Sequence, residues 1–195
     1  MFLLIIFIII IFVILFFVYN NLYKYDNLVK IKSPIDNEYY WVRDKNDKFQ
    51  ASNTLAKIKI NMKKLIYYLQ QNINKFPKNM SYIKDLISRT KKINIMETPQ
   101  DDKYTSYTIN KGEKIVFCLR SKLLDNIHDM NTIMYVVIHE MGHIGCPEYG
   151  HTPLFKKIFK FLLEQSIIIK IYKPIDYRIN PQNYCGITIN EYLLD

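Results

Sequence analysis

The segment His139-Glu140-Met141-Gly142-His143 constrains this chain more than any other, because its two histidines are four residues apart. On an α-helix this spacing places both imidazoles on one face, one turn apart, where they can reach a common point. An apolar stretch over 133–138 leads into the segment, and Gly145 follows it. The pattern therefore predicts a helix over about 131–144 that ends just after a pair of metal-binding histidines.

A third ligand is expected in the loop that follows this helix. His151 directly precedes Thr152-Pro153, a cap and first-turn proline that predict a helix to about Ile168. Glu148 and Glu164 are the alternatives, and we favour His151 because it lies in the helix-breaking loop and supplies a ligand of the same type. Imidazole nitrogens suit Zn²⁺, and three protein ligands leave the open position that catalytic zinc sites have.

Glu140 is the candidate catalytic residue. It follows the first histidine, so its carboxylate is expected beside the metal rather than on it, where it can deprotonate a water molecule as a general base. Tyr184 and Tyr177 are candidate donors to the oxyanion. These residues predict a zinc-dependent metallopeptidase that hydrolyses peptide bonds. The alternative is a non-enzymatic, membrane-anchored virion or scaffold protein whose zinc site is structural and closed by a fourth protein ligand.

The amino-terminal run from Phe2 to Val18 contains no polar residue. About 20 apolar residues in a helix can span a bilayer. No basic residue precedes the run and no small-residue cleavage site follows it before Ser33, so the run predicts an uncleaved anchor rather than a signal peptide. We therefore expect a transmembrane anchor over 1–20, a juxtamembrane linker over 21–28 and a metallopeptidase domain over 29–195.

Lysines follow the apolar run but do not precede it. The positive-inside rule then places the carboxyl-terminal domain in the cytosol or the interior of a virion. The expected protein is a single-pass protein of a host membrane or viral envelope, acting on a protein or peptide substrate. The net charge of +9 leaves a nucleic-acid partner open, but the lysines are scattered and no basic cluster supports one.

The rest of the chain predicts an α+β fold, a zincin-like minidomain in which small antiparallel strands pack against the histidine-bearing helix. Three cysteines without a CxxC pair argue against a disulfide framework and favour free thiols.

The expected elements are a hairpin over 29–43, a helix from Ser52 or Asn53 to Gln71, a helix over 81–92, a loop over 96–103, a hairpin over 104–120 whose residues 115–119 are buried on both faces, and a strand over 187–189.

The segment HEMGHIGCPEYGHTPLF resembles the zinc motif of WLM-domain metallopeptidases, relatives of the SprT/Spartan-like proteases. The resemblance implies zinc held by His139, His143 and His151, Glu140 as general base, and the protein cleavage performed by cellular members, whose substrates include proteins crosslinked to DNA. The gap from His143 to His151 is longer than in those members. The version encoded by large nucleocytoplasmic DNA viruses is similar over essentially the whole chain after the apolar run, including Tyr104–Ser121, Phe155–Glu164 and Asp176–Ile189.

Overall fold

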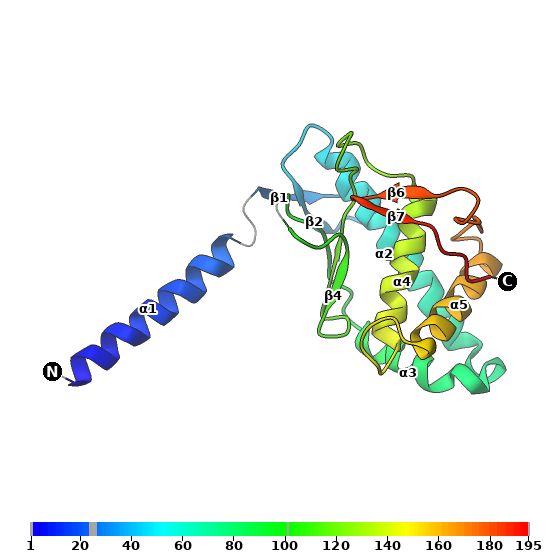
Figure 1. Ribbon diagram of the computed structural model, residues 1–195, viewed down its shortest axis with the longest axis horizontal. Coiled ribbons are helices and arrows are strands. Elements are labelled where there is room, and N and C mark those ends of the chain that lie inside the picture. Colours follow the sequence, from blue (N-terminus) through cyan, green and yellow to red (C-terminus); the bar gives the residue numbers. More distant parts are fainter. Residues whose placement is uncertain (1, 24–26, 101, 195) are drawn as a thin grey trace.

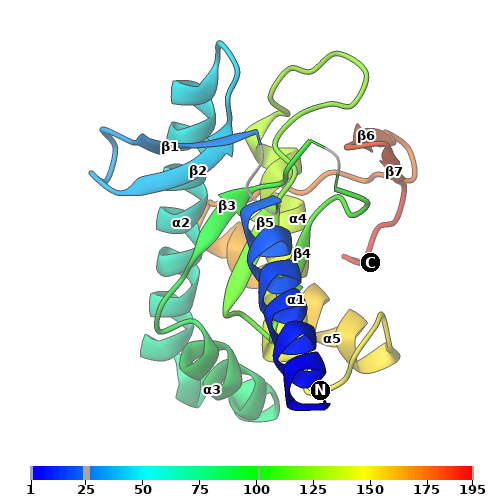
Figure 2. The same cartoon turned by 90° about the vertical axis from the view of Figure 1, so that its left-hand side faces the viewer.

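The computed structural model describes residues 2–23, 27–100 and 102–194 (Figure 1). A small three-stranded sheet lies against the helices α2 (Lys48–Gln71) and α4 (Met130–Gly145), as the second view shows (Figure 2). Two further two-stranded hairpins complete the domain. The arrangement confirms the predicted α+β class, in which short strands and helices share one hydrophobic core.

The first hairpin is confirmed and begins one residue earlier than predicted, at Leu28. Strands β1 (Leu28–Lys32) and β2 (Tyr39–Arg43) pair antiparallel, with Val29 opposite Val42. The turn between them is closed by the Ser33 amide, which donates to the Glu38 carbonyl at 2.9 Å. Val42 is fully buried, so one face of the hairpin joins the core. The pattern was readable from sequence because all of its pairings are local.

Helix α2 begins at Lys48, earlier than the predicted Ser52 or Asn53. Neither residue caps the helix, because each side chain bonds elsewhere. The Ser52 hydroxyl donates to the Phe49 carbonyl at 2.9 Å, and the Asn53 amide oxygen accepts from Ser33 Oγ at 2.7 Å. The expected apolar stripe is buried along the helix, and α3 (Met80–Arg89) follows it through two short 3₁₀ turns, Ile73–Lys75 and Pro77–Asn79.

The central sheet has the order β3–β5–β4. Strand β5 (Lys114–Phe117) pairs antiparallel with β4 (Tyr107–Ile109) and parallel with β3 (Ile95–Glu97). Burial of 115–117 on both faces is confirmed. The prediction of a loop over 96–103 is wrong for residues 96 and 97, which belong to β3. This strand is held by parallel pairing with β5, which is distant in sequence, and so short a segment shows no alternating pattern from which to predict it.

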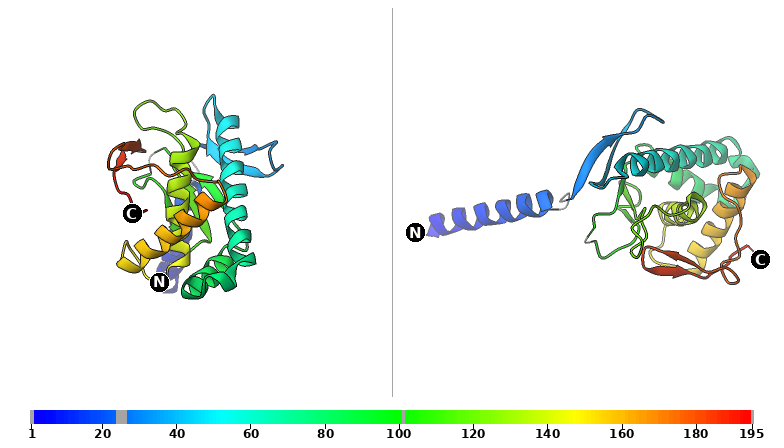
Figure 3. Two further views of the ribbon diagram at one scale, coloured as in Figure 1. Left: turned by 90° about the vertical axis from the view of Figure 1, so that its right-hand side faces the viewer. Right: turned by 90° about the horizontal axis from the view of Figure 1, so that it is seen from above.

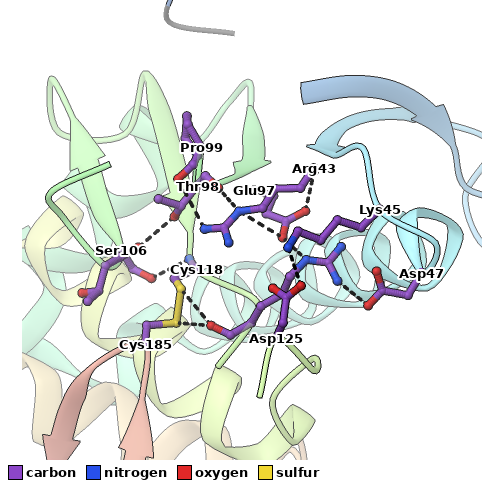
Figure 4. Close-up of polar contacts among 12 residues, drawn as sticks. Arg43, Lys45, Asp47, Glu97, Thr98, Pro99, Ser106, Cys118, Asp125 and Cys185 are labelled. Carbon is purple, nitrogen blue, oxygen red and sulfur yellow. Dashed lines mark hydrogen bonds and ion pairs between the residues drawn. A yellow bond between two sulfur atoms is a disulfide. The ribbon is translucent and has the colours of Figure 1, made fainter. Parts of the chain in front are cut away.

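The buried Glu97 carboxylate at the end of β3 joins this sheet to the first hairpin through Arg43 (Figure 4) and also pairs with Arg120. Glu97 accepts a hydrogen bond of 2.7 Å from Nε of Arg120 and one of 2.8 Å from the Arg43 amide. Asp47, before α2, accepts from the Arg120 guanidinium as well. Burial raises the pKa of Glu97, while the two arginines act in the opposite direction. Charges this far from water are retained only when they are paired and hydrogen-bonded.

Helices α4 and α5 (Pro153–Ile168) have the predicted positions and pack against each other (Figure 3). Asp129 caps α4 by accepting from the Asn131 amide at 2.8 Å. The expected cap of α5 is also confirmed, since Thr152 Oγ1 accepts from the Phe155 amide at 3.2 Å. Each cap satisfies amide groups that the first turn of a helix leaves unpaired.

The tail forms a hairpin of β6 (Gln182–Tyr184) and β7 (Ile187–Ile189), the latter as predicted. A disulfide joins Cys118, at the end of β5, to Cys185 in the hairpin turn, with their Cα atoms 6.3 Å apart (Figure 4). The expectation of three free thiols is therefore wrong for this pair and holds for Cys146, which is free and buried. The two bonded residues are 67 positions apart, and only the fold brings them together.

Helix α1 (Phe2–Tyr23) stands apart from the domain (Figure 3). Its side chains from Ile5 to Phe16 are exposed. In the part of the chain that the structure describes, no helix is both long and apolar enough to cross a membrane.

The prediction of a transmembrane anchor over 1–20 is therefore wrong, as are the single-pass localisation and the orientation that depended on it. The predicted linker over 21–28 includes residues 24–26, which lie outside the described residues.

Candidate metal centre

Three imidazoles meet at the carboxyl-terminal end of α4. The Nε2 atoms of His139 and His143 are 3.1 Å apart, and Nε2 of His151 lies 2.9 Å from the first and 3.2 Å from the second. The two α4 histidines share a face because they are one helical turn apart. The loop after α4 turns back and adds the third. All three histidines predicted as ligands are thus brought together.

The donor set and its spacing fit zinc. Nitrogens bound tetrahedrally at about 2.0–2.1 Å would be about 3.3 Å from one another, close to the separations found here. Burial, with the neighbouring His143 and His151, lowers the pKa of His139 to about 3. Burial likewise lowers the pKa of His143 to about 4. Neutral imidazoles are the form that binds a metal ion.

Aromatic rings from α5 hold the imidazoles in place. Phe155 stacks on His143, with centroids 4.2 Å apart, and meets His139 and His151 edge-on at 4.9 Å and 5.0 Å. Gly142 permits this approach of α5, since a Cβ there would lie 3.1 Å from the Phe155 ring. The glycine within the motif therefore serves the packing of α5 against α4.

Glu140 lines the same cavity as the three histidines and is not a member of the histidine group. Its side chain is only 5% exposed, and Oε2 accepts a hydrogen bond of 2.9 Å from Thr108 Oγ1 on β4. Burial raises the pKa of Glu140 to about 7, while the Thr108 hydrogen bond acts in the opposite direction. Helix α4 thus turns the Glu140 carboxylate toward β4, and its role as a general base stays a prediction.

A cavity of about 790 Å³ opens over these residues. One wall is the edge strand β4 with the turn after it, and the floor is the motif face of α4. The loop around His151, the first turns of α5 and the tail after β6 complete the lining. The cavity is large enough for several residues of an extended polypeptide or for a small-molecule ligand.

The alternative ligands lie elsewhere. Glu164 is exposed on α5 and does not join the histidine group, and the Glu148 carboxylate accepts a hydrogen bond from Thr152. Tyr184 lines the cavity, but its hydroxyl donates to the Cys118 carbonyl at 2.6 Å. Tyr177 is buried against Tyr135 and is not part of the cavity lining. Of the two tyrosines, only Tyr184 borders the site.

Two residues at the site were not anticipated from the sequence. Thr108 contacts the Glu140 carboxylate, and Lys111, in the turn after β4, bonds the loop that precedes His151. Both contacts cross more than 30 positions of sequence. A threonine in a strand and a lysine in a turn carry no local signal that points to a metal centre.

Viral proteins are similar to this chain. Uncharacterized protein R325 of Acanthamoeba polyphaga mimivirus is 46% identical over 164 residues, covering 84% of this chain and 83% of its own length. Protein 136R of Invertebrate iridescent virus 6 is 37% identical over 82 residues, which cover 41% of this chain and 44% of its own. Protein 042R of Invertebrate iridescent virus 3 is 39% identical over 83 residues, 42% and 50% of the two chains.

No established family profile matches the chain. Among solved structures, Wss1 from Saccharomyces cerevisiae superposes with a TM-score of 0.49 at 21% identity, covering 66% of this chain and 86% of its own.

Proposed function

This chain belongs to the same family as protein R325 of Acanthamoeba polyphaga mimivirus, and we propose that it is a zinc-dependent metallopeptidase. The observation that carries the proposal is the convergence of three imidazole Nε2 atoms beside the buried carboxylate of Glu140. The resemblance of the motif segment to WLM-domain metallopeptidases supports the same assignment. We propose that residues 29–195 form a domain of that type.

The number of candidate protein ligands favours a catalytic zinc site over a structural one. Catalytic zinc sites use three protein ligands and keep a position open, whereas structural sites are closed by four. Within the described ranges the group has three members, and it lines an open cavity. The alternative, a non-enzymatic scaffold with a structural zinc site, requires a fourth ligand that these residues do not provide.

The positions of these residues indicate the role of each in peptide hydrolysis. Zinc, when bound, supplies a Lewis acid that polarises the scissile carbonyl and acidifies a water molecule. Glu140 accepts the proton of the attacking water and then donates it to the leaving amine as the peptide bond breaks. Thr108 fixes the orientation of that carboxylate through its hydrogen bond to Oε2. His139, His143 and His151 would hold the ion.

The proposed substrate is a protein or peptide in extended conformation. Strand β4 is at the edge of its sheet, and Ser106, Tyr107 and Thr108 line the cavity. An extended peptide can pair with such an edge through main-chain hydrogen bonds. Paired there, its backbone would pass next to Glu140, which Thr108 contacts directly.

Metal analysis combined with peptide cleavage tests the proposal. The full chain is expected to bind one zinc ion and to cleave members of a random peptide library. Removal of zinc by a chelator should abolish cleavage, and added zinc should restore it. A protein that holds a full equivalent of zinc and cleaves nothing in a broad library would favour the structural alternative instead.

A further inference from the structure

The loop that carries His151 has little packing of its own. Residues 147–151 are exposed, and this segment between α4 and α5 contains no helix or strand. Fixing an exposed backbone in one conformation costs entropy, so such a loop is mobile unless specific contacts order it. His151 can complete the metal centre only if its loop is held. Thr152 does this at the far end, where it caps α5.

Lys111 holds the near end of the loop. Its Nζ donates hydrogen bonds of 2.8 Å to the Cys146 carbonyl and 2.8 Å to the Glu148 carbonyl. The same ammonium lies 4.2 Å from the centroid of the Tyr149 ring, within range of a cation–π interaction. With a longer hydrogen bond of 3.5 Å to the Pro147 carbonyl, this one side chain contacts all four residues between the end of α4 and Gly150.

The conformation of the turn at residues 110–112 places Lys111 next to the loop that follows α4. Asn110 and Lys111 have φ angles of 47° and 55°, and Gly112 follows at 116°. A Cβ on Gly112 would lie 3.2 Å from the Arg89 carbonyl and 3.2 Å from the Ile144 side chain. The turn is thus pressed against the ends of α3 and α4, next to the loop. Positive φ here places the Lys111 stem across the end of α4.

We propose that Lys111 is a positioning residue for the third metal ligand, an inference that rests on the proposed zinc site. By tying the carbonyls of the loop to one cation, Lys111 fixes the loop in the shape that brings His151 within reach of His139 and His143. It does so before the metal arrives. Lys111 donates no hydrogen bond to a histidine among the described residues, so it positions the loop through its backbone carbonyls, while its charge helps to lower the pKa of His143.

The test compares Lys111→Met with Lys157→Met in the full chain. Methionine keeps an apolar stem and removes the donors, and Lys157 is an exposed lysine of α5 that does not line the cavity. Loss of a group that orients a ligand typically weakens metal binding about 10- to 100-fold. We expect that loss in Lys111→Met by chelator competition, no change in Lys157→Met, and partial recovery in Lys111→Arg.

Hydrogen exchange of the metal-free protein supplies a readout that does not depend on zinc. The amides of residues 148–151 should exchange faster in Lys111→Met than in Lys157→Met, with the core of α4 unchanged. If metal-free Lys111→Met melts well below the Lys157→Met control, Lys111→Gln is used in place of Lys111→Met. The zinc affinity of Lys111→Gln is then expected to fall below that of Lys111→Arg.

Equal zinc affinity in the Lys111 variants and the Lys157 control overturns the positioning role. That result leaves the proposed function intact as long as the unaltered chain binds zinc. An unaltered chain without zinc affinity defeats the proposed function itself, so the two failures are distinguishable.

Discussion

The hydroxyl of Thr108 donates a 2.9 Å hydrogen bond to Oε2 of Glu140, and so joins the edge strand of the sheet to the helix that carries His139 and His143. No other residue that the structure describes bonds the Glu140 carboxylate through a hydrogen bond. The bond therefore fixes which oxygen faces the strand and which is left for water. A substrate paired with β4 would lie next to the group that sets the base in position.

Replacement of Thr108 by valine should lower turnover without loss of zinc. Valine preserves the shape of the side chain and removes the hydroxyl, and a hydrogen bond to a charged group contributes about 1.5–3 kcal/mol. We expect kcat to fall at least roughly tenfold, with metal content unchanged. Thr188→Val is the matched control, because Thr188 lines the cavity and bonds Asn183 instead. Equal kcat in both variants would remove the orienting role.

Replacement of His151 by alanine should weaken zinc binding by orders of magnitude, since one of three ligands is lost. Glu164→Ala is the control, because this exposed residue was the competing candidate and lies outside the histidine group. Chelator competition measures both affinities. Undiminished binding in His151→Ala together with loss in Glu164→Ala would reverse the ligand assignment.

Loss of the Cys118–Cys185 bond should destabilise the domain. The chain-entropy relation gives about 4 kcal/mol for a closed loop of this length, within the usual range of about 2–5 kcal/mol. Urea unfolding of the Cys118→Ser/Cys185→Ser variant should show that loss. Reductant should shift the unaltered chain to the same midpoint and leave the double variant where it is. A midpoint insensitive to reductant in the unaltered chain would mean that the bond contributes nothing.

Breaking the buried ion pair should cost more than breaking an exposed one. Arg120→Met leaves the Glu97 carboxylate buried without its main partner, which typically costs about 3–5 kcal/mol. Lys45→Met removes a more exposed pair with Asp125, for which about 0–1 kcal/mol is expected. Chemical denaturation measures both. Similar losses in the two variants would show that the buried Arg120–Glu97 pair is no more important to stability than an exposed pair.

The features that the sequence predicted well are local ones. The first hairpin and the helix of the motif depend on turn residues and on periodicity within a few positions. Contacts between distant positions were missed, as with the parallel pairing of β3 and the disulfide of Cys118 with Cys185. The apolar run at the amino terminus led to the wrong prediction of a transmembrane anchor, since composition alone does not establish a membrane span.

The metal centre shows the same division. The two α4 histidines and Glu140 follow from helical spacing, and His151 follows from its place before a capped helix. Thr108 and Lys111 meet the site only through the fold of β4 and its turn. Side chains that position a site from another element leave no spacing in the sequence by which to find them.

The central claim is tested most directly by the turnover of Glu140→Gln on a peptide that the unaltered chain cleaves, measured at equal zinc content. Glutamine keeps the shape of the side chain and removes the base. Turnover should fall by roughly 10²–10⁴-fold while zinc is retained. Equal turnover of Glu140→Gln and the unaltered chain would contradict the assignment of Glu140 as the general base of a zinc peptidase.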